Sequence, residues 1–127
     1  AVHPNHPELS DPNHGVKLNG GVVIKYNAAQ HYTSDGVSAA LFQLLCEEAG
    51  VPFQRYANRA DMAGGSTLGN IANTQVSLNT VDIGLPQLAM HSAWETAGAE
   101  DTSSMVRALT VFYGKSLELT ENGLALV

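Results

Sequence analysis

Apolar residues gather into short runs along the chain, and their spacing predicts the order of helices and strands. Residues 22–26 are β-branched and aromatic, which is typical of a buried strand. From residue 34 to residue 50 the pattern is helical, with Ser34 as the expected N-cap and Gly50 as the stop. The expected apolar face comprises Val37, Ala40, Leu41, Leu44 and Leu45. Residues 53–57 read as a second strand, so the order predicts a βαβ unit with parallel strands.

The remaining segments extend this α/β pattern. Residues 1–20 are rich in Pro, Gly and Asn and predict a long loop. The later elements are expected as a short helix at 68–77, a strand at 80–84, a loop at 86–96, a helix at 101–115 with Met105, Val106, Leu109 and Phe112 on one face, and a strand and turn within 117–127, the turn at 121–123. Three short strands make a thin sheet, so we expect further strands from elsewhere.

Composition and charge exclude several classes of partner. The 127 residues are 44% hydrophobic and 14% charged, which fits one globular domain. Six Lys and Arg against twelve Asp and Glu leave a net charge of −6 and no basic face, so we expect neither nucleic acid nor a membrane as a partner. No apolar run approaches the roughly 20 residues that span a bilayer, and no signal peptide pattern is visible, which favours a cytoplasmic protein. The absence of an initiator Met favours a processed chain or a piece of a longer one.

The one thiol and the histidines of the opening loop carry weak chemical signals. Cys46 lies in the apolar helical pattern, so a small buried side chain is favoured over a reactive thiol. His3 and His6 have a spacing that could bring two imidazoles to one metal ion. Because Pro4 and Pro7 forbid a regular helix there, solvated loop histidines are the favoured interpretation.

Three other features point more directly to a site. His91 follows an expected strand, where ligands of an α/β sheet gather and a neutral imidazole suits a divalent metal, although a hydrogen-bonded loop histidine fits the pattern as well. Residues 64–69 form a glycine loop before a helix, which favours either an anion such as a carboxylate or a plain tight turn. The loop lacks the Gly-Lys-Ser/Thr ending of a P-loop, so no nucleotide is expected. Lys25 interrupts an apolar strand and either reaches solvent or binds an anion.

These pieces together resemble the C-terminal part of the aspartyl aminopeptidase family of two-metal zinc peptidases. The resemblance runs in order from residue 1 to about residue 113 and is carried by the segments 1–5, 11–14, 23–25, 59–69 and 81–92. It implies a three-layer αβα sandwich with a mixed central sheet. It also implies that residues 1–127 are the C-terminal segment of a peptidase catalytic domain, with an upstream catalytic segment and an inserted oligomerisation domain outside this chain. Family members form homo-oligomers, and the resemblance implies a dodecamer.

The resemblance assigns roles to a few residues. His91 matches a metal-binding histidine, and His3 matches a histidine that faces the substrate carbonyl and stabilises the oxyanion. Lys25 matches the residue that pairs with the acidic side chain of the substrate. Tyr32 and the loop residues Gly64, Gly65, Ser66 and Thr67 correspond to substrate-pocket positions. His6 has no counterpart.

The implied reaction is removal of an N-terminal Asp or Glu from a peptide by a water bridged between two zinc ions. This chain would hold one metal ligand of five, and the other ligands and the general base would come from the remaining N-terminal part of the same enzyme. Ala63 and Asn70 stand where the family often has Pro, His31 where it often has Arg, and residues 114–127 have no match. The alternative is a non-catalytic remnant, a scaffold or assembly module without a complete metal centre.

Overall fold

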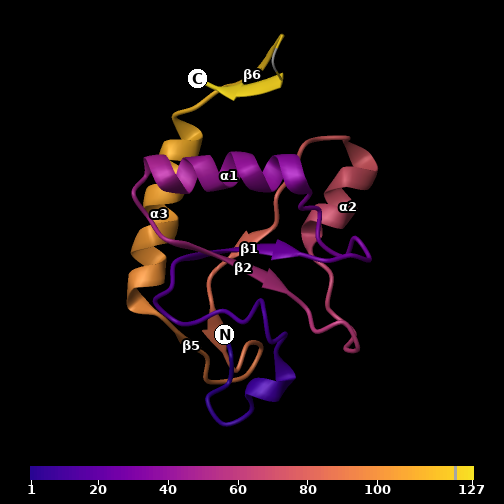
Figure 1. Ribbon diagram of the computed structural model, residues 1–127, viewed down its shortest axis with the longest axis vertical. Coiled ribbons are helices and arrows are strands. Elements are labelled where there is room, and N and C mark those ends of the chain that lie inside the picture. Colours follow the sequence, from indigo (N-terminus) through magenta and orange to yellow (C-terminus); the bar gives the residue numbers. More distant parts are fainter. Residues whose placement is uncertain (122) are drawn as a thin grey trace.

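The computed structural model describes residues 1–121 and 123–127, which form three helices, one 3₁₀ turn and seven short strands (Figure 1). In chain order these are η1 (Pro7–Leu9), β1 (Val22–Tyr26), α1 (Gly36–Glu48), β2 (Phe53–Ala57), α2 (Leu68–Gln75), β3 (Ile83–Gly84), β4 (Gln87–Leu88), β5 (Thr96–Ala97), α3 (Ala99–Tyr113), β6 (Leu117–Thr120) and β7 (Gly123–Leu126). Within these residues, no helix has the length and apolar character needed to cross a membrane.

The central sheet is mixed and has the order β2-β1-β3. β1 and β2 are parallel, in a register that runs from Val22 opposite Phe53 to Tyr26 opposite Ala57. β3 is antiparallel to β1, with Ile83 opposite Ile24. The expected βαβ unit is therefore confirmed. The expected strand at 80–84 is shorter, because only Ile83 and Gly84 pair with β1.

The ends of α1 are set by side-chain and glycine geometry. The N-cap is Asp35 and not Ser34: the Asp35 carboxylate accepts the Ser38 N–H at 2.7 Å, and the Asp35 N–H donates to Ser38 Oγ at 3.0 Å. This reciprocal capping box satisfies donors that the first turn would otherwise leave free. At the other end Gly50 has φ +60°, which ends the helix as expected.

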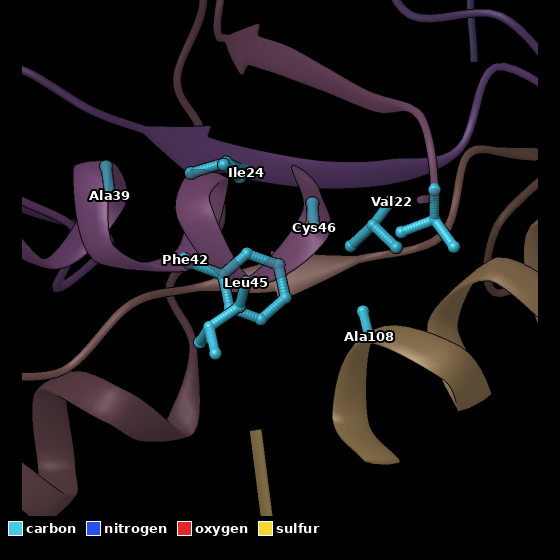
Figure 2. Close-up of a cluster of buried hydrophobic side chains, with 8 residues drawn as sticks. Val22, Ile24, Ala39, Phe42, Leu45, Cys46 and Ala108 are labelled. Carbon is cyan, nitrogen blue, oxygen red and sulfur yellow. The ribbon is translucent and has the colours of Figure 1, made fainter. Parts of the chain in front are cut away.

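The core lies between β1 and the helices α1 and α3 (Figure 2). It consists of Val22, Ile24, Ala39, Phe42, Leu45, Cys46, Val51 and Ala108. Of the apolar face predicted for α1, Leu45 is buried and Leu41 is half-buried, whereas the prediction was wrong at Val37 and Leu44, which are 52% and 53% exposed. Apolar residues occupy nearly every side of this helix, so the helical period alone does not select the buried stripe.

Cys46 is fully buried, as predicted. Burial is the main cause that raises the pKa of its thiol to about 11, and the charge of Glu47 adds to it. The thiol is therefore protonated at neutral pH, and it behaves as a small apolar side chain.

The buried residues of α3 are small or polar, and Met105 is the residue of its predicted apolar face that packs against the core, so this prediction was partly wrong. Val106 is 60% exposed and Phe112 is 46% exposed, whereas Asp101, Ser104 and Ala108 are buried. The Asp101 carboxylate accepts the N–H groups of Asn19 and Gly21, each at 2.8 Å. α3 is therefore tied through its first turn to the segment that leads into β1.

Two hairpins complete the chain. The loop expected at 86–96 contains β4, which pairs antiparallel with β5. Two-residue strands leave no alternating pattern to detect, which is why the sequence did not predict them. The expected strand in the tail is confirmed as the β6–β7 hairpin, which projects past the end of α3 (Figure 1). Asn122, in the turn expected at 121–123, lies outside the described residues.

Candidate active site

The two faces of β1 meet different surroundings. Alternate residues of a strand point to opposite faces, and Val22 and Ile24 pack in the core against α1. Val23 and Lys25 line a cavity of about 570 Å³ on the other face. The opening loop, β2, the glycine loop and the segment from Leu85 to His91 complete its walls. The cavity thus gathers segments that are far apart in the sequence.

Lys25 is half-buried in the wall of this cavity. Its ammonium nitrogen lies 5.5 Å from the centroid of the Tyr32 ring, within the range of a cation–π contact. A side chain at Gly84 would lie 3.0 Å from Lys25 Cε, so glycine there leaves room for the lysine stem. Across residues 1–121 and 123–127, no carboxylate forms an ion pair with Lys25. The charge is therefore available to an anionic ligand.

Two tyrosines flank Lys25. Tyr32 is 8% exposed, and burial raises the pKa of its phenol, with smaller contributions from Tyr56 and Asp82. Tyr56 lies opposite Lys25 in the register of β1 and β2, and burial raises its pKa too. Both phenols are consequently neutral at physiological pH and can donate a hydrogen bond to an anion.

The glycine loop contributes Gly65, Ser66 and Thr67 to the cavity. Gly64 instead borders a smaller neighbouring cavity of about 200 Å³. A side chain at Gly64 would meet the side-chain amide of Asn58, which would have to move to make room for it. Thr67 is the N-cap residue of α2 but makes no side-chain cap. Its hydroxyl donates to Asp82 Oδ2 at 2.9 Å instead.

Sequence reasoning missed Asp82 and Glu95. Asp82 lies just before β3 and accepts hydrogen bonds from the loop before α1 and from the glycine loop. Its sequence signal was a carboxylate inside an apolar strand pattern, which requires donors nearby. Glu95 carried no comparable signal.

His91 occupies a restrained turn between β4 and β5. Its φ is +71°, an uncommon value for a residue other than glycine. Glu95 holds this turn, because its Oε1 accepts the His91 N–H at 2.5 Å and its Oε2 accepts Gln87 Nε2 at 2.9 Å. The residue is exposed and lines the cavity that Lys25 also lines.

His3 lies outside the residues that line this cavity, although its neighbours Ala1 and Val2 belong to them. The His3 and His6 rings are 5.1 Å apart, and His6 Nδ1 lies 3.1 Å from Glu8 Oε1. Both histidines are exposed. The role of His3 at a substrate carbonyl therefore stays a prediction.

The described residues can supply one ligand of a metal centre but not a complete set of ligands. In the part of the chain that the structure describes, no group of three His, Cys, Asp or Glu side chains could hold a metal ion. His91 is accessible at the cavity and accounts for a single imidazole. A zinc ion there would need further ligands from outside the described residues.

Comparison with known proteins identifies the family. The family described as aminopeptidase I zinc metalloprotease (M18) matches residues 1–113. The chain belongs to the M18 peptidase family. A protein called "Probable M18 family aminopeptidase 2" from Pseudomonas paraeruginosa is 48% identical over 115 residues, which are 91% of this chain and 27% of the relative. The chain thus spans about a quarter of the length of this M18 relative.

Solved M18 structures have the same fold. The structure "Cryo-EM structure of the Ape4 and Nbr1 complex" superposes with a TM-score of 0.87 and 34% identity, over 89% of this chain and 22% of that one. The structure of the mApe1 dodecamer of S. cerevisiae gives 0.76 and 28%, over 88% and 24%. The resemblance seen in the sequence and the α/β fold with a mixed sheet are both confirmed.

Proposed function

We propose that these 127 residues form one wall of the active site of a cytoplasmic zinc aminopeptidase that removes acidic residues from the N-terminus of peptides. The observation that carries the proposal is that Lys25, with no ion-pair partner in residues 1–121 and 123–127, lines the same cavity as His91. β1 supplies the lysine and the β4–β5 turn supplies the histidine. Lys25 would bind the side chain of the first residue of the substrate, and His91 would lie towards the peptide bond that is cut.

Lys25 supports selection of an acidic first residue. A carboxylate in the cavity would pair with the ammonium, and the neutral phenols of Tyr32 and Tyr56 could donate hydrogen bonds to it. Val16, Val23 and Leu85 line the same cavity and would exclude water from the pair, which strengthens the attraction. A neutral side chain would leave the lysine without this partner.

His91 supports the metal role through its exposure and its restrained backbone. The chemistry that zinc supplies when bound is acidification of a water molecule, which can then attack a peptide carbonyl near neutral pH. His91 would hold one ion, and Glu95 would keep the turn in place through the His91 N–H. His3 would donate to the oxyanion, a role typically worth about 3 kcal/mol. The remaining ligands and the general base would come from the N-terminal part of the same enzyme.

Assembly belongs to the same proposal. One solved relative is described as a dodecamer, and we expect the complete enzyme to form a homo-oligomer of that kind. The second candidate function is a scaffold or assembly module of the same fold without peptidase activity. The lack of a three-ligand group in the described residues favours this alternative for the chain on its own.

Metal analysis and hydrolysis of Asp-anilide distinguish the two functions. The full-length polypeptide that carries these residues should contain zinc and hydrolyse Asp-anilide faster than Leu-anilide. The 127-residue chain assayed beside it should do neither. A full-length polypeptide without metal or turnover would support the scaffold function. The mass of the intact polypeptide from its source shows which of the two forms exists there.

A further inference from the structure

One carboxylate connects the separate segments that form the cavity wall. Asp82 Oδ2 accepts the Thr33 N–H at 2.8 Å and the Thr33 hydroxyl at 3.0 Å. The same oxygen accepts the Thr67 hydroxyl at 2.9 Å. Thr33 directly follows Tyr32, and Thr67 is the residue of the glycine loop that directly precedes α2. A single oxygen therefore joins two segments that each supply a residue to the cavity.

The backbone of Asp82 adds the third segment. Its carbonyl accepts the Lys25 N–H at 2.9 Å, and its own N–H donates to Ser34 Oγ at 2.8 Å. Lys25, Tyr32 and Thr67 all line the cavity, and each is bonded to Asp82 directly or through the next residue in the chain. The position of Asp82 thus fixes three walls relative to one another.

The surroundings of Asp82 are tightly packed and hold neutral donors. A side chain at Gly69 in α2 would lie 3.0 Å from Thr33 Oγ1 and 3.3 Å from Asp82 Oδ2, so glycine lets the helix approach. No cation among the described residues forms an ion pair with Asp82. The bonded partners of the carboxylate are thus the N–H and hydroxyl groups of the two loops.

We propose that Asp82 is a positioning residue that sets the selectivity of the cavity for an acidic side chain. It does so by holding Tyr32 and the glycine loop against β1, without touching the substrate. This inference rests on the proposed function, in which Lys25 binds that side chain. Without the carboxylate, Thr33 and Thr67 lose their common acceptor, whereas the backbone bond to Lys25 remains.

The test compares Asp82→Ala with Asp101→Ala in the full-length polypeptide. Asp101 is the control, because its carboxylate also accepts backbone N–H groups at 2.8 Å, but these belong to Asn19 and Gly21, which do not line the cavity. Hydrogen exchange is followed at residues 31–34 and 58–69, and kcat and KM are measured with Asp-anilide and Leu-anilide. Asp82→Asn, which keeps an acceptor oxygen, and Thr67→Val, which removes one donor, provide variants with smaller perturbation.

Asp82→Ala should speed exchange in those two segments about tenfold and lower the Asp-to-Leu ratio of kcat/KM about tenfold, mainly through KM for Asp-anilide. Asp82→Asn should keep most of the exchange protection and most of the Asp-to-Leu ratio. Thr67→Val should speed exchange in residues 58–69 alone. Asp101→Ala should lower stability without changing the ratio. An unchanged ratio in Asp82→Ala with faster exchange, or equal effects of the two alanine variants, would overturn the inference. If Lys25→Ala leaves the ratio unchanged, the proposed function fails, and the exchange pattern still tests whether Asp82 holds the loops.

Discussion

The two faces of β1 have different tasks. On the α1 face, Val22 and Ile24 are completely buried in the hydrophobic core (Figure 2). On the opposite face, Lys25 and its neighbours surround a cavity of about 570 Å³. Because successive residues of a strand alternate between faces, one five-residue segment supplies both the core and the pocket. Changes on the first face should therefore alter stability, and changes on the second should alter binding.

His91→Ala should have the largest effect, on the cavity side. Removing a residue that hydrogen-bonds to a metal ligand typically costs about 10–100-fold in metal affinity or activity. Removing the ligand itself should therefore cost at least about 100-fold. Zinc content and Asp-anilide turnover of the full-length polypeptide measure this loss. His6→Ala is the control, since His6 is exposed, pairs with Glu8 and does not line the cavity. Similar losses in both variants would contradict the assignment of His91.

Ile24→Ala should show the opposite behaviour, on the core side. Ile24 is fully buried, so Ile24→Ala should lower the free energy of unfolding by about 2–5 kcal/mol, and Ile24→Val by about 1 kcal/mol. Denaturant unfolding of the full-length polypeptide measures both changes. The Asp-to-Leu ratio of kcat/KM should stay unchanged in the folded variants. A changed ratio at unchanged stability would mean that the two faces are not separate.

Much of this arrangement could be predicted from local patterns. β1 and α1 were predicted because a β-branched run and a glycine stop are local signals, and β2 was predicted in the segment after that stop. The buried face of α1 was not, because apolar residues surround that helix and only tertiary packing selects Ala39 and Phe42. Local pattern predicts an element more reliably than it predicts which side of the element is covered.

Some residues of the candidate site could likewise be predicted from local patterns, and others could not. Lys25 was detectable as a charge inside an apolar strand, and His91 as an imidazole after a strand. Asp82 and Glu95 act through hydrogen bonds to residues distant in the chain or to a turn backbone, and neither interaction leaves a spacing in the sequence.

Asp35→Ala should have a smaller effect on the core side. Losing the capping box of α1 should cost about 1 kcal/mol. The Ser38 N–H lowers the pKa of Asp35 in the folded chain below its ordinary value of 3.8. The stability that the ionised Asp35 carboxylate contributes is therefore fully present above the ordinary pKa. It is lost as the pH falls through the lowered pKa of the folded chain. Unfolding curves at pH 7 and pH 3 should differ less for the variant than for the parent, and an equal difference would contradict the capping role.

The smallest effect is expected at Cys46. A fully buried thiol with a pKa of about 11 is almost entirely protonated at pH 8. A thiol reagent should therefore modify the native chain only as fast as the chain unfolds, and Cys46→Ala should leave the Asp-to-Leu ratio unchanged. Rapid stoichiometric modification under native conditions would show that the core face is open.

Lys25→Ala in the full-length polypeptide tests the central claim most directly, with the exposed loop residue Lys17→Ala as control. The measurement is kcat/KM for Asp-anilide and for Leu-anilide. A lost charge-assisted hydrogen bond corresponds to about 10–100-fold, so Asp-anilide hydrolysis should fall by that factor in Lys25→Ala. Leu-anilide hydrolysis and both activities of Lys17→Ala should stay near the parent values. Equal losses on the two substrates in Lys25→Ala would contradict the account.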